Sequence, residues 1–195
     1  MSELNYFSIK EMVSYSGLSR TTLLYYEKIG ILKASIRTPA NYRVYTQSDK
    51  NILELGSGTG QHAVFMAPQL PTLTWHTSEL IENHTGIKQW LAESEADNIQ
   101  SPLHYQAGAT IFPDVDADVV MTVNTLHIMS WACVQSLVKD LGQNLKAGCR
   151  VLIYGPFNYG GEFTSNSNAE FDVWLKNKDT LSGIRDFEAV CDLFQ

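Results

Sequence analysis

Apolar and polar residues follow a helical period near the start of the chain. Ile9, Met12 and Val13 have the i, i+3, i+4 spacing of a short amphipathic helix. Ser8 and Glu11 stand at the two positions of a capping box, in which each side chain accepts the other residue's backbone N–H. The pattern therefore predicts a helix that begins directly after residue 8.

A second helix and a hairpin are predicted to follow. Residues 16–18 form a Gly-containing turn, and Ser19 caps a helix over 20–28 that ends near Gly30. Two short helices joined by such a turn make a helix-turn-helix. Residues 35–45 then alternate between apolar and polar residues on either side of a turn, which predicts a two-stranded wing.

From residue 50 onward, apolar runs of strand length alternate with helical patterns. The pattern predicts strands at 52–55, 73–78, 103–106, 118–123 and 150–154, and helices from 61, at 87–92 and at 131–145. Such alternation favours an α/β fold with a doubly wound, mostly parallel, Rossmann-like sheet. Ligands of these sheets bind beyond the carboxyl ends of the strands.

A glycine-rich turn follows the first of these strands. Gly56, Gly58 and Gly60 are spaced by two, directly before a predicted helix. A dinucleotide site would need a third glycine at Gln61, and Glu54 has the wrong charge for a pyrophosphate but a suitable one for a cation. A coincidental turn beside a surface acid is the alternative interpretation.

This stretch resembles the first motif of class I S-adenosyl-L-methionine (SAM) methyltransferases. A second acid, Glu79, closes the next strand 19 residues after Gly60, where that family places the carboxylate that accepts both ribose hydroxyls. Gln106 stands where the family usually has an adenine-contacting Asp. The resemblance implies SAM as the cofactor, bound by Glu54, Gly56, Ser57, Gly58, Gly60, Glu79, Gln106 and Asn124.

Three further stretches, 123–131, 154–161 and 183–188, resemble an uncharacterised bacterial family of class I methyltransferase-like proteins. This resemblance runs from about Ile52 to the end of the chain and implies SAM binding without a particular substrate. It also implies an incomplete sheet, because the chain ends before the family's last two strands.

Asn124 and His127, just after the fourth predicted strand, are the candidate catalytic residues, with His127 as a general base. A purely structural histidine is the alternative. The stretch 124–127 lacks the paired prolines of amino-methylating DNA enzymes, so we expect a small-molecule acceptor. Residues 157–159 either line an acceptor pocket or form an ordinary surface loop.

The first segment resembles the N-terminal half of a MerR-type DNA-binding domain. The resemblance covers 6–49 and includes the stretches 17–19, 25–27, 29–32 and 41–45. It implies that DNA is contacted by Arg20, Thr21, Tyr25, Tyr26, Tyr42 and Arg43. It also implies a homodimer, since such regulators bind paired half-sites. A helical pair that merely packs on the next domain is the alternative.

The sign of the net charge changes near residue 48, where the MerR-type resemblance also ends. The net charge of −7 combines +3 over residues 1–48 with −10 over the remainder. We therefore predict a DNA-binding segment at 1–48 and a methyltransferase-like domain at 49–195, with only the first suited to a polyanion.

The composition also indicates the cellular compartment in which the protein is expected. Three widely spaced cysteines, no signal peptide and no long apolar run predict a cytoplasmic protein that does not bind membranes. The histidines lack metal-ligand spacing, so we predict no metal.

Three functions remain open from the sequence. The first is a SAM-dependent methyltransferase-like protein with an added DNA-binding module. The second is a transcriptional regulator whose second domain senses a ligand without catalysis. The third is a fusion of two incomplete genes in which neither part is active.

Overall fold

The structure, a computed structural model, describes residues 6–16, 19–29, 36–37, 43–46, 50–70 and 73–195. The first part of the chain, here called the head, contains two helices and a small sheet. Its elements are β1 (Tyr6–Ser8), α1 (Ile9–Ser16), α2 (Arg20–Ile29), β2 (Ile36–Arg37) and β3 (Arg43–Thr46).

Both helices of the head begin at the caps that the sequence predicts. The Ser8 N–H donates to Glu11 Oε2 at 2.7 Å, and the Glu11 N–H donates to Ser8 Oγ at 3.3 Å, which completes the capping box. The Thr22 N–H donates to Ser19 Oγ at 3.0 Å at the start of α2. The helix-turn-helix prediction is thus confirmed in its two helices.

The predicted wing is present as the antiparallel pair β2–β3. A third strand, β1, pairs with the other edge of β3 and gives the order β1-β3-β2. β1 was not predicted from the sequence, because three residues are too few to show a period of two. The turn of the wing, with Tyr42, lies outside the described residues.

The second part of the chain, here called the body, is built on a parallel sheet of order β6-β5-β4-β7-β8. Its strands are β4 (Lys50–Leu55), β5 (Leu73–Glu79), β6 (Ile99–His104), β7 (Val119–Val123) and β8 (Arg150–Tyr154). Its connecting helices are α3 (Gln61–Met66), η1 (Ala67–Gln69), η2 (Ile81–Asn83), α4 (His84–Glu93) and α5 (Trp131–Asn144). The doubly wound parallel sheet is confirmed.

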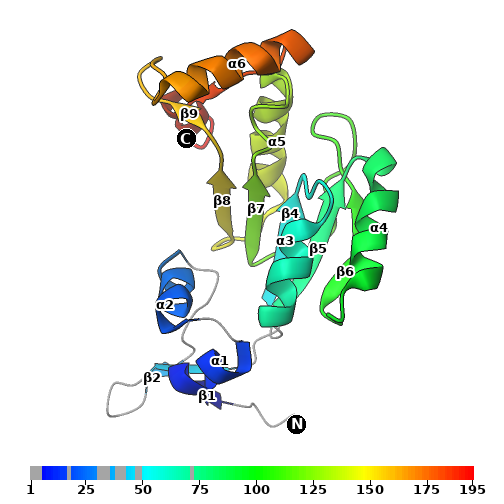
Figure 1. The fold of residues 1–195 in the computed structure, drawn as a ribbon, viewed down its shortest axis with the longest axis vertical. Coiled ribbons are helices and arrows are strands. Elements are labelled where there is room, and N and C mark those ends of the chain that lie inside the picture. Colours follow the sequence, from blue (N-terminus) through cyan, green and yellow to red (C-terminus); the bar gives the residue numbers. More distant parts are fainter. Residues whose placement is uncertain (1–5, 17–18, 30–35, 38–42, 47–49, 71–72) are drawn as a thin grey trace.

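The body ends in shorter elements that follow β8. They are β9 (Phe157–Asn158), α6 (Asn166–Lys178), β10 (Arg185–Asp186) and α7 (Phe187–Asp192), with β9 and β10 paired in parallel. Figure 1 shows α6 at the end of the sheet toward which the strand arrows point. No helix in the described part of the chain is both long and apolar enough to cross a membrane.

The bounds of the third strand of the body differ from those predicted from the sequence. That prediction placed the strand at 103–106, directly after Pro102, whereas β6 covers Ile99–His104. Pro102 is tolerated because β6 is an edge strand, and the register against β5 shifts beside it, between His76 and Ser78.

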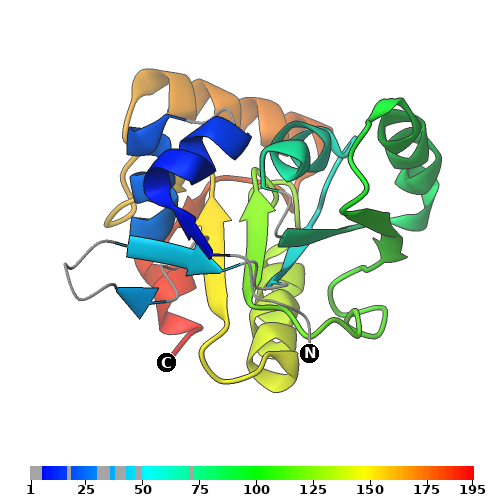
Figure 2. The ribbon, with the colours of Figure 1, turned by 90° about the horizontal axis from the view of Figure 1, so that it is seen from below.

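Side chains of the central strands alternate between two separate cores. Ile52 and Trp75 pack with Ala63 of α3 on one face of the sheet. Leu53 and Leu137 pack together on the other face, which α5 covers. Figure 2 shows α3 and α5 on opposite sides of the strands. Because both faces are covered, the ligand-accessible surface of the sheet is confined to its ends.

The head and the candidate ligand site lie at opposite ends of the sheet. Met12 of α1 and Leu23 of α2 are buried in the same core cluster as Ile52 and Leu70. Figure 1 places the head beside the amino ends of the parallel strands, away from α6. The carboxyl ends, where α/β sheets bind ligands, therefore face away from the head.

Candidate functional site

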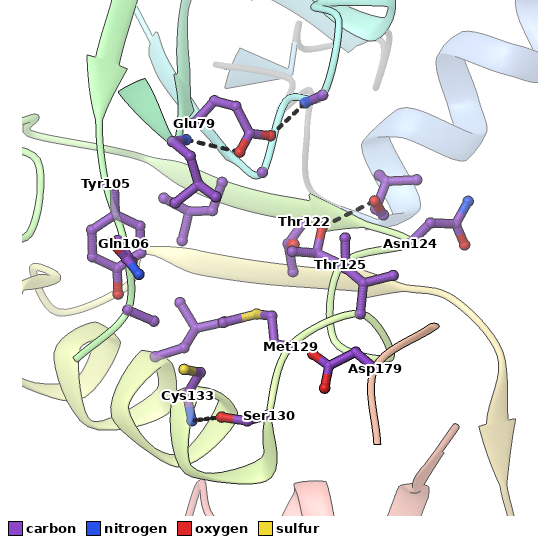
Figure 3. Close-up of a pocket in the computed structure, with 18 residues that line it drawn as sticks. Glu79, Tyr105, Gln106, Thr122, Asn124, Thr125, Met129, Ser130, Cys133 and Asp179 are labelled. Atoms are coloured by element: carbon purple, nitrogen blue, oxygen red, sulfur yellow. Dashed lines mark hydrogen bonds between the residues drawn. The ribbon is translucent and has the colours of Figure 1, made fainter. Parts of the chain in front are cut away.

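A cavity of about 560 Å³ opens at the carboxyl ends of the strands. Figure 3 shows side chains from both sides of the topological switch between β4 and β7 converging on it. It is lined by Leu55, Gly56, Gly58, Glu79, Leu80, Tyr105, Gln106, Ala107, Thr122, Val123, Asn124, Thr125, Ile128, Met129, Ser130, Cys133, Leu137 and Asp179. This size and position are typical of a small-molecule site.

The glycine-rich turn forms one wall of the cavity. Gly56 has φ +71°, and a Cβ placed there would lie 2.8 Å from both Oγ1 and Cγ2 of Thr125. Gly58 has φ +58° with nothing within 4 Å of its Cβ position. Both positions therefore favour glycine, Gly56 also for lack of space. Gly60 has φ +81° and Ser57 is buried, and neither lines the cavity.

Glu79 is fixed at the end of β5 by two backbone N–H groups, one of which belongs to the turn. The Gly58 N–H donates to Glu79 Oε2 at 2.8 Å, and the Leu80 N–H donates to Oε1 at 2.8 Å. These charge-assisted hydrogen bonds hold the carboxylate against the turn while it lines the cavity. Figure 3 shows both bonds as dashed lines beside Glu79.

Glu54 lies on the other face of the turn and does not line the cavity. Its side chain is fully buried, with Oε1 bonded to His62 Nδ1 at 2.8 Å and Oε2 accepting the Trp75 indole N–H at 3.1 Å. The hydrogen bond to Glu54 raises the pKa of His62. Glu54, a predicted cofactor residue, is thus packed among the side chains beneath α3 and supports the turn from behind.

Asn124 follows β7 and lines the cavity. Its φ of +55° is the only positive value of a non-glycine residue in the described ranges, a conformation that asparagine tolerates. Gln106 also lines the cavity, just beyond β6. The structure thus brings together five of the predicted cofactor residues, namely Gly56, Gly58, Glu79, Gln106 and Asn124.

His127 is 5% exposed and lies behind the cavity wall, with its ring edge-on to Phe171 at a centroid distance of 5.3 Å. It remains close to Asn124, because Asn124 Oδ1 and His127 Nδ1 both lie 3.7 Å from the Cβ position of Gly155. Burial, and to a lesser extent the Arg185 guanidinium, lowers the pKa of His127. The imidazole is therefore neutral at neutral pH and able to accept a proton.

The cavity also has polar residues that were not predicted as site residues, Thr122 and Asp179 among them. Thr122 is 2% exposed, and its hydroxyl has no hydrogen-bond partner in the described structure. Its place near the end of a buried strand was the signal that could have revealed it. Asp179 follows α6 and had no local signal, because only the fold brings it beside Thr125 and Met129. Phe157 and Tyr159 instead pack against Phe187.

The structure describes the side chains of some of the candidate DNA-contacting residues. Arg20 and Thr21 are exposed in the first turn of α2, and Tyr25 is 56% exposed one turn later. Tyr26 lies in α2 and Arg43 in β3, and their side chains are outside the described structure, as is all of Tyr42. Thr21 and Tyr25 share a helix face because they are four residues apart.

The head is similar to known transcriptional regulators. Residues 8–45 match the MerR family of regulatory proteins. The HTH-type transcriptional regulator YfmP of Bacillus subtilis (strain 168) is 27% identical over 107 residues, which cover 53% of this chain and 76% of YfmP.

Solved structures of methyltransferases share the fold. An O-methyltransferase family protein from Burkholderia thailandensis superposes with a TM-score of 0.67 at 15% identity, covering 95% of this chain and 51% of that one. Human N-acetylserotonin methyltransferase in complex with SAM gives a TM-score of 0.63 at 14% identity, covering 96% and 50%. The chain thus spans about half the length of these structures, and at such identities the likeness shows the fold alone.

The motif of the glycine-rich turn, the order of the parallel strands and the cavity at their carboxyl ends agree on a class I methyltransferase-like architecture. Residues 35–195 match one further family, beginning inside the head and running through the whole body. Because that match covers most of its length, the chain belongs to the family described as Protein of unknown function (DUF938).

Proposed function

We propose that this chain is a SAM-dependent methyltransferase-like protein that carries a MerR-type DNA-binding helix-turn-helix. The DNA-binding segment is residues 1–48, the methyltransferase-like domain is residues 49–195, and the methyl acceptor is a small molecule. The observation that carries the proposal is the Glu79 carboxylate, held by the Gly58 and Leu80 N–H groups at the wall of the cavity.

The residues of the cavity suit SAM. The cofactor is a sulfonium cation, and the residues lining the cavity include two carboxylates and no Lys, Arg or His. Glu79 would accept the ribose hydroxyls, Gln106 would bond the adenine, and the backbone at Gly56 and Gly58 would approach the amino-acid end. The unpartnered Thr122 hydroxyl also calls for a polar ligand atom, since buried hydroxyls are normally bonded.

Bound SAM would supply an activated methyl group, and the chain would supply orientation and a dry site. In the proposed mechanism Asn124, at the cavity wall, orients the acceptor. His127 lies close behind it and would take up the acceptor's proton. The lowered pKa of His127 supports this role, because the imidazole stays unprotonated at neutral pH.

The position of the head supports a small-molecule acceptor. DNA bound to α2 would lie at the amino ends of the strands, whereas the cavity opens at their carboxyl ends. A duplex held by the head would therefore lie at the other end of the sheet from the cavity of the same chain. Homodimerisation and a cytoplasmic location remain part of the proposal, in keeping with the MerR-type head.

Calorimetric titration of S-adenosylhomocysteine (SAH), the product form of the cofactor, tests the proposal. We expect micromolar binding by the wild-type chain. Gly58→Ala should weaken it by about tenfold, because a left-handed conformation costs a non-glycine residue roughly 1–2 kcal/mol. Absence of SAH binding by well-folded protein would exclude the methyltransferase function and leave the head as the functional part.

A second candidate function is a DNA-binding regulator whose body binds a ligand without catalysis. The exposed Arg20 and Thr21 in the first turn of α2 and the similarity to YfmP favour it. SAH-dependent changes in DNA binding without methyl transfer would support this function. Methyl transfer that is unaffected by DNA would support the first. Failure of both assays would indicate an inactive fusion.

Arg20→Ala is expected to weaken binding to a labelled 30-base-pair duplex of mixed sequence at every salt concentration. Loss of one phosphate contact should lower the slope of log affinity against log salt by about 1. Fluorescence anisotropy measures both quantities. The control is Lys139→Ala, which removes the same charge from α5 of the body, where Lys139 is exposed. Equal effects of the two variants would contradict a DNA-contacting role for Arg20.

A further inference from the structure

The segment after α6 brings a carboxylate to the cavity. No sequence motif predicted this carboxylate. Asp179 lines the cavity together with Thr125, Ile128 and Met129. Figure 3 shows Asp179 beside Met129 and Thr125, across the cavity from Tyr105 and Gln106. Asp179 thus lies at the end of the cavity formed by the loop after β7, away from the proposed adenine end.

This segment, residues 179–185, is fastened to the loop after β7 through its second half. The Gly183 N–H donates to His127 O at 2.8 Å, and the Ser182 hydroxyl donates to Ile128 O at 3.1 Å. The Arg185 guanidinium donates to the two carbonyls on either side, those of Leu126 and Met129. Four consecutive carbonyls therefore accept hydrogen bonds from Ser182, Gly183 and Arg185, which fixes this part of the segment relative to the cavity.

The backbone around Asp179 is equally well held. Its N–H donates to Leu175 O at 2.9 Å, and its carbonyl accepts the Ser182 N–H at 3.0 Å. Its Oδ1 accepts the Leu181 N–H at 2.9 Å. No hydrogen bond to Oδ2 and no ion pair of Asp179 is formed with the described residues. Asp179 is exposed, and its carboxylate is thus positioned by the backbone and retains one oxygen for a ligand of the cavity.

The charge of the cavity favours a cation at this end. Glu79 and Asp179 are the carboxylates among the lining residues, and no lining residue is Lys, Arg or His. Both oxygens of Glu79 already accept backbone N–H groups, whereas Oδ2 of Asp179 accepts none, and the apolar Ile128 and Met129 line the same cavity. The unpartnered hydroxyl of the almost fully buried Thr122 independently indicates that the cavity takes a polar ligand.

We propose that Asp179 is a specificity-determining residue that pairs with the ammonium group of a small, apolar amine acceptor. The inference rests on the proposed function of the cavity and names its acceptor class. The carboxylate supplies the charge complement, and Ile128 and Met129 supply apolar contact for the body of the amine.

Titrations of SAH-saturated protein with phenethylamine, 2-phenylethanol and 3-phenylpropionate test this inference. The three probes share a phenyl group and differ in the charge of the second polar end. We expect the amine to bind at least fivefold more tightly than the alcohol, and the carboxylate to bind most weakly. In Asp179→Asn the preference for the amine over the alcohol should fall below twofold. In the control Asp114→Asn, an exposed carboxylate outside the cavity, it should be unchanged.

A second pair of titrations separates acceptor from cofactor recognition. SAH has an amino-acid tail with an ammonium group, and 5′-methylthioadenosine lacks it. We expect Asp179→Asn to bind both with wild-type affinity. Weakened binding of SAH alone would assign Asp179 to the cofactor's ammonium group and overturn the inference. So would equal binding of the three phenyl probes by wild-type protein that binds SAH. Wild-type protein that fails to bind SAH would instead refute the proposed function itself.

Discussion

Replacing Glu79 with alanine is expected to weaken SAH binding by about a hundredfold or more. Two hydrogen bonds from ribose hydroxyls to a carboxylate contribute roughly 1.5–3 kcal/mol each, and 1.4 kcal/mol corresponds to a factor of ten in affinity. The variant also frees the Gly58 and Leu80 N–H groups that the carboxylate holds. The turn is then less well positioned for the ligand, which adds to the loss.

Isothermal titration calorimetry with SAH measures this effect. Glu82→Ala is the matched control, because Glu82 is an exposed acid in η2, three residues away, and does not line the cavity. Glu79→Gln separates charge from shape. Its amide would keep one acceptor oxygen but face the other N–H with a donor, so an intermediate affinity is expected. Glu79→Ala protein that is folded by circular dichroism and binds SAH within threefold of wild type would exclude Glu79 from the cofactor site.

Replacing His127 with glutamine is expected to lower the rate of methyl transfer by about a hundredfold, the lower end of the range for general acid–base catalysis. SAH affinity should change less than twofold, because His127 lies behind the cavity wall and is not among the lining residues. The assay follows radiolabelled methyl transfer from SAM to a pool of small cytosolic metabolites.

The pH dependence distinguishes a base from a packing residue. Since burial lowers the pKa of His127 below its ordinary value of 6.5, the neutral form persists from alkaline pH to below 6.5. The wild-type rate should therefore stay constant down to mildly acidic pH and fall as the pH drops through that lowered pKa. In His127→Gln this acidic limb should be absent. An acidic limb that persists in the variant, or an unchanged rate, would assign His127 to packing against Phe171 alone.

Much of the fold was predictable because its signals are local. The capping pairs Ser8–Glu11 and Ser19–Thr22 lie within one helical turn, so the sequence shows both partners together. The strands of the body are apolar runs that need two covered faces, which favours a parallel sheet. The error at β6 arose because Pro102 is incompatible with a central strand, and only the sheet order reveals that β6 is an edge strand.

The candidate site was predictable where it follows strand ends. Gly56, Gly58, Glu79, Gln106 and Asn124 all line the cavity, since the carboxyl ends of parallel strands meet at one edge. Asp179 was not predictable in this way. It belongs to a segment that reaches the cavity only through hydrogen bonds to carbonyls more than fifty residues earlier in the chain.

The sequence by itself determined that a glycine-rich turn links a buried strand to a helix, with two acids nearby, behind a capped pair of helices. Only the tertiary structure decided which acid faces the cavity. Glu54 shares its face of β4 with Ile52, so the packing of α3 buries it against His62 and Trp75. Glu79 ends its strand, so its carboxylate extends past the sheet into the cavity. Two similar carboxylates thus differ in role because side-chain direction alternates along a strand and only the strand ends reach the cavity.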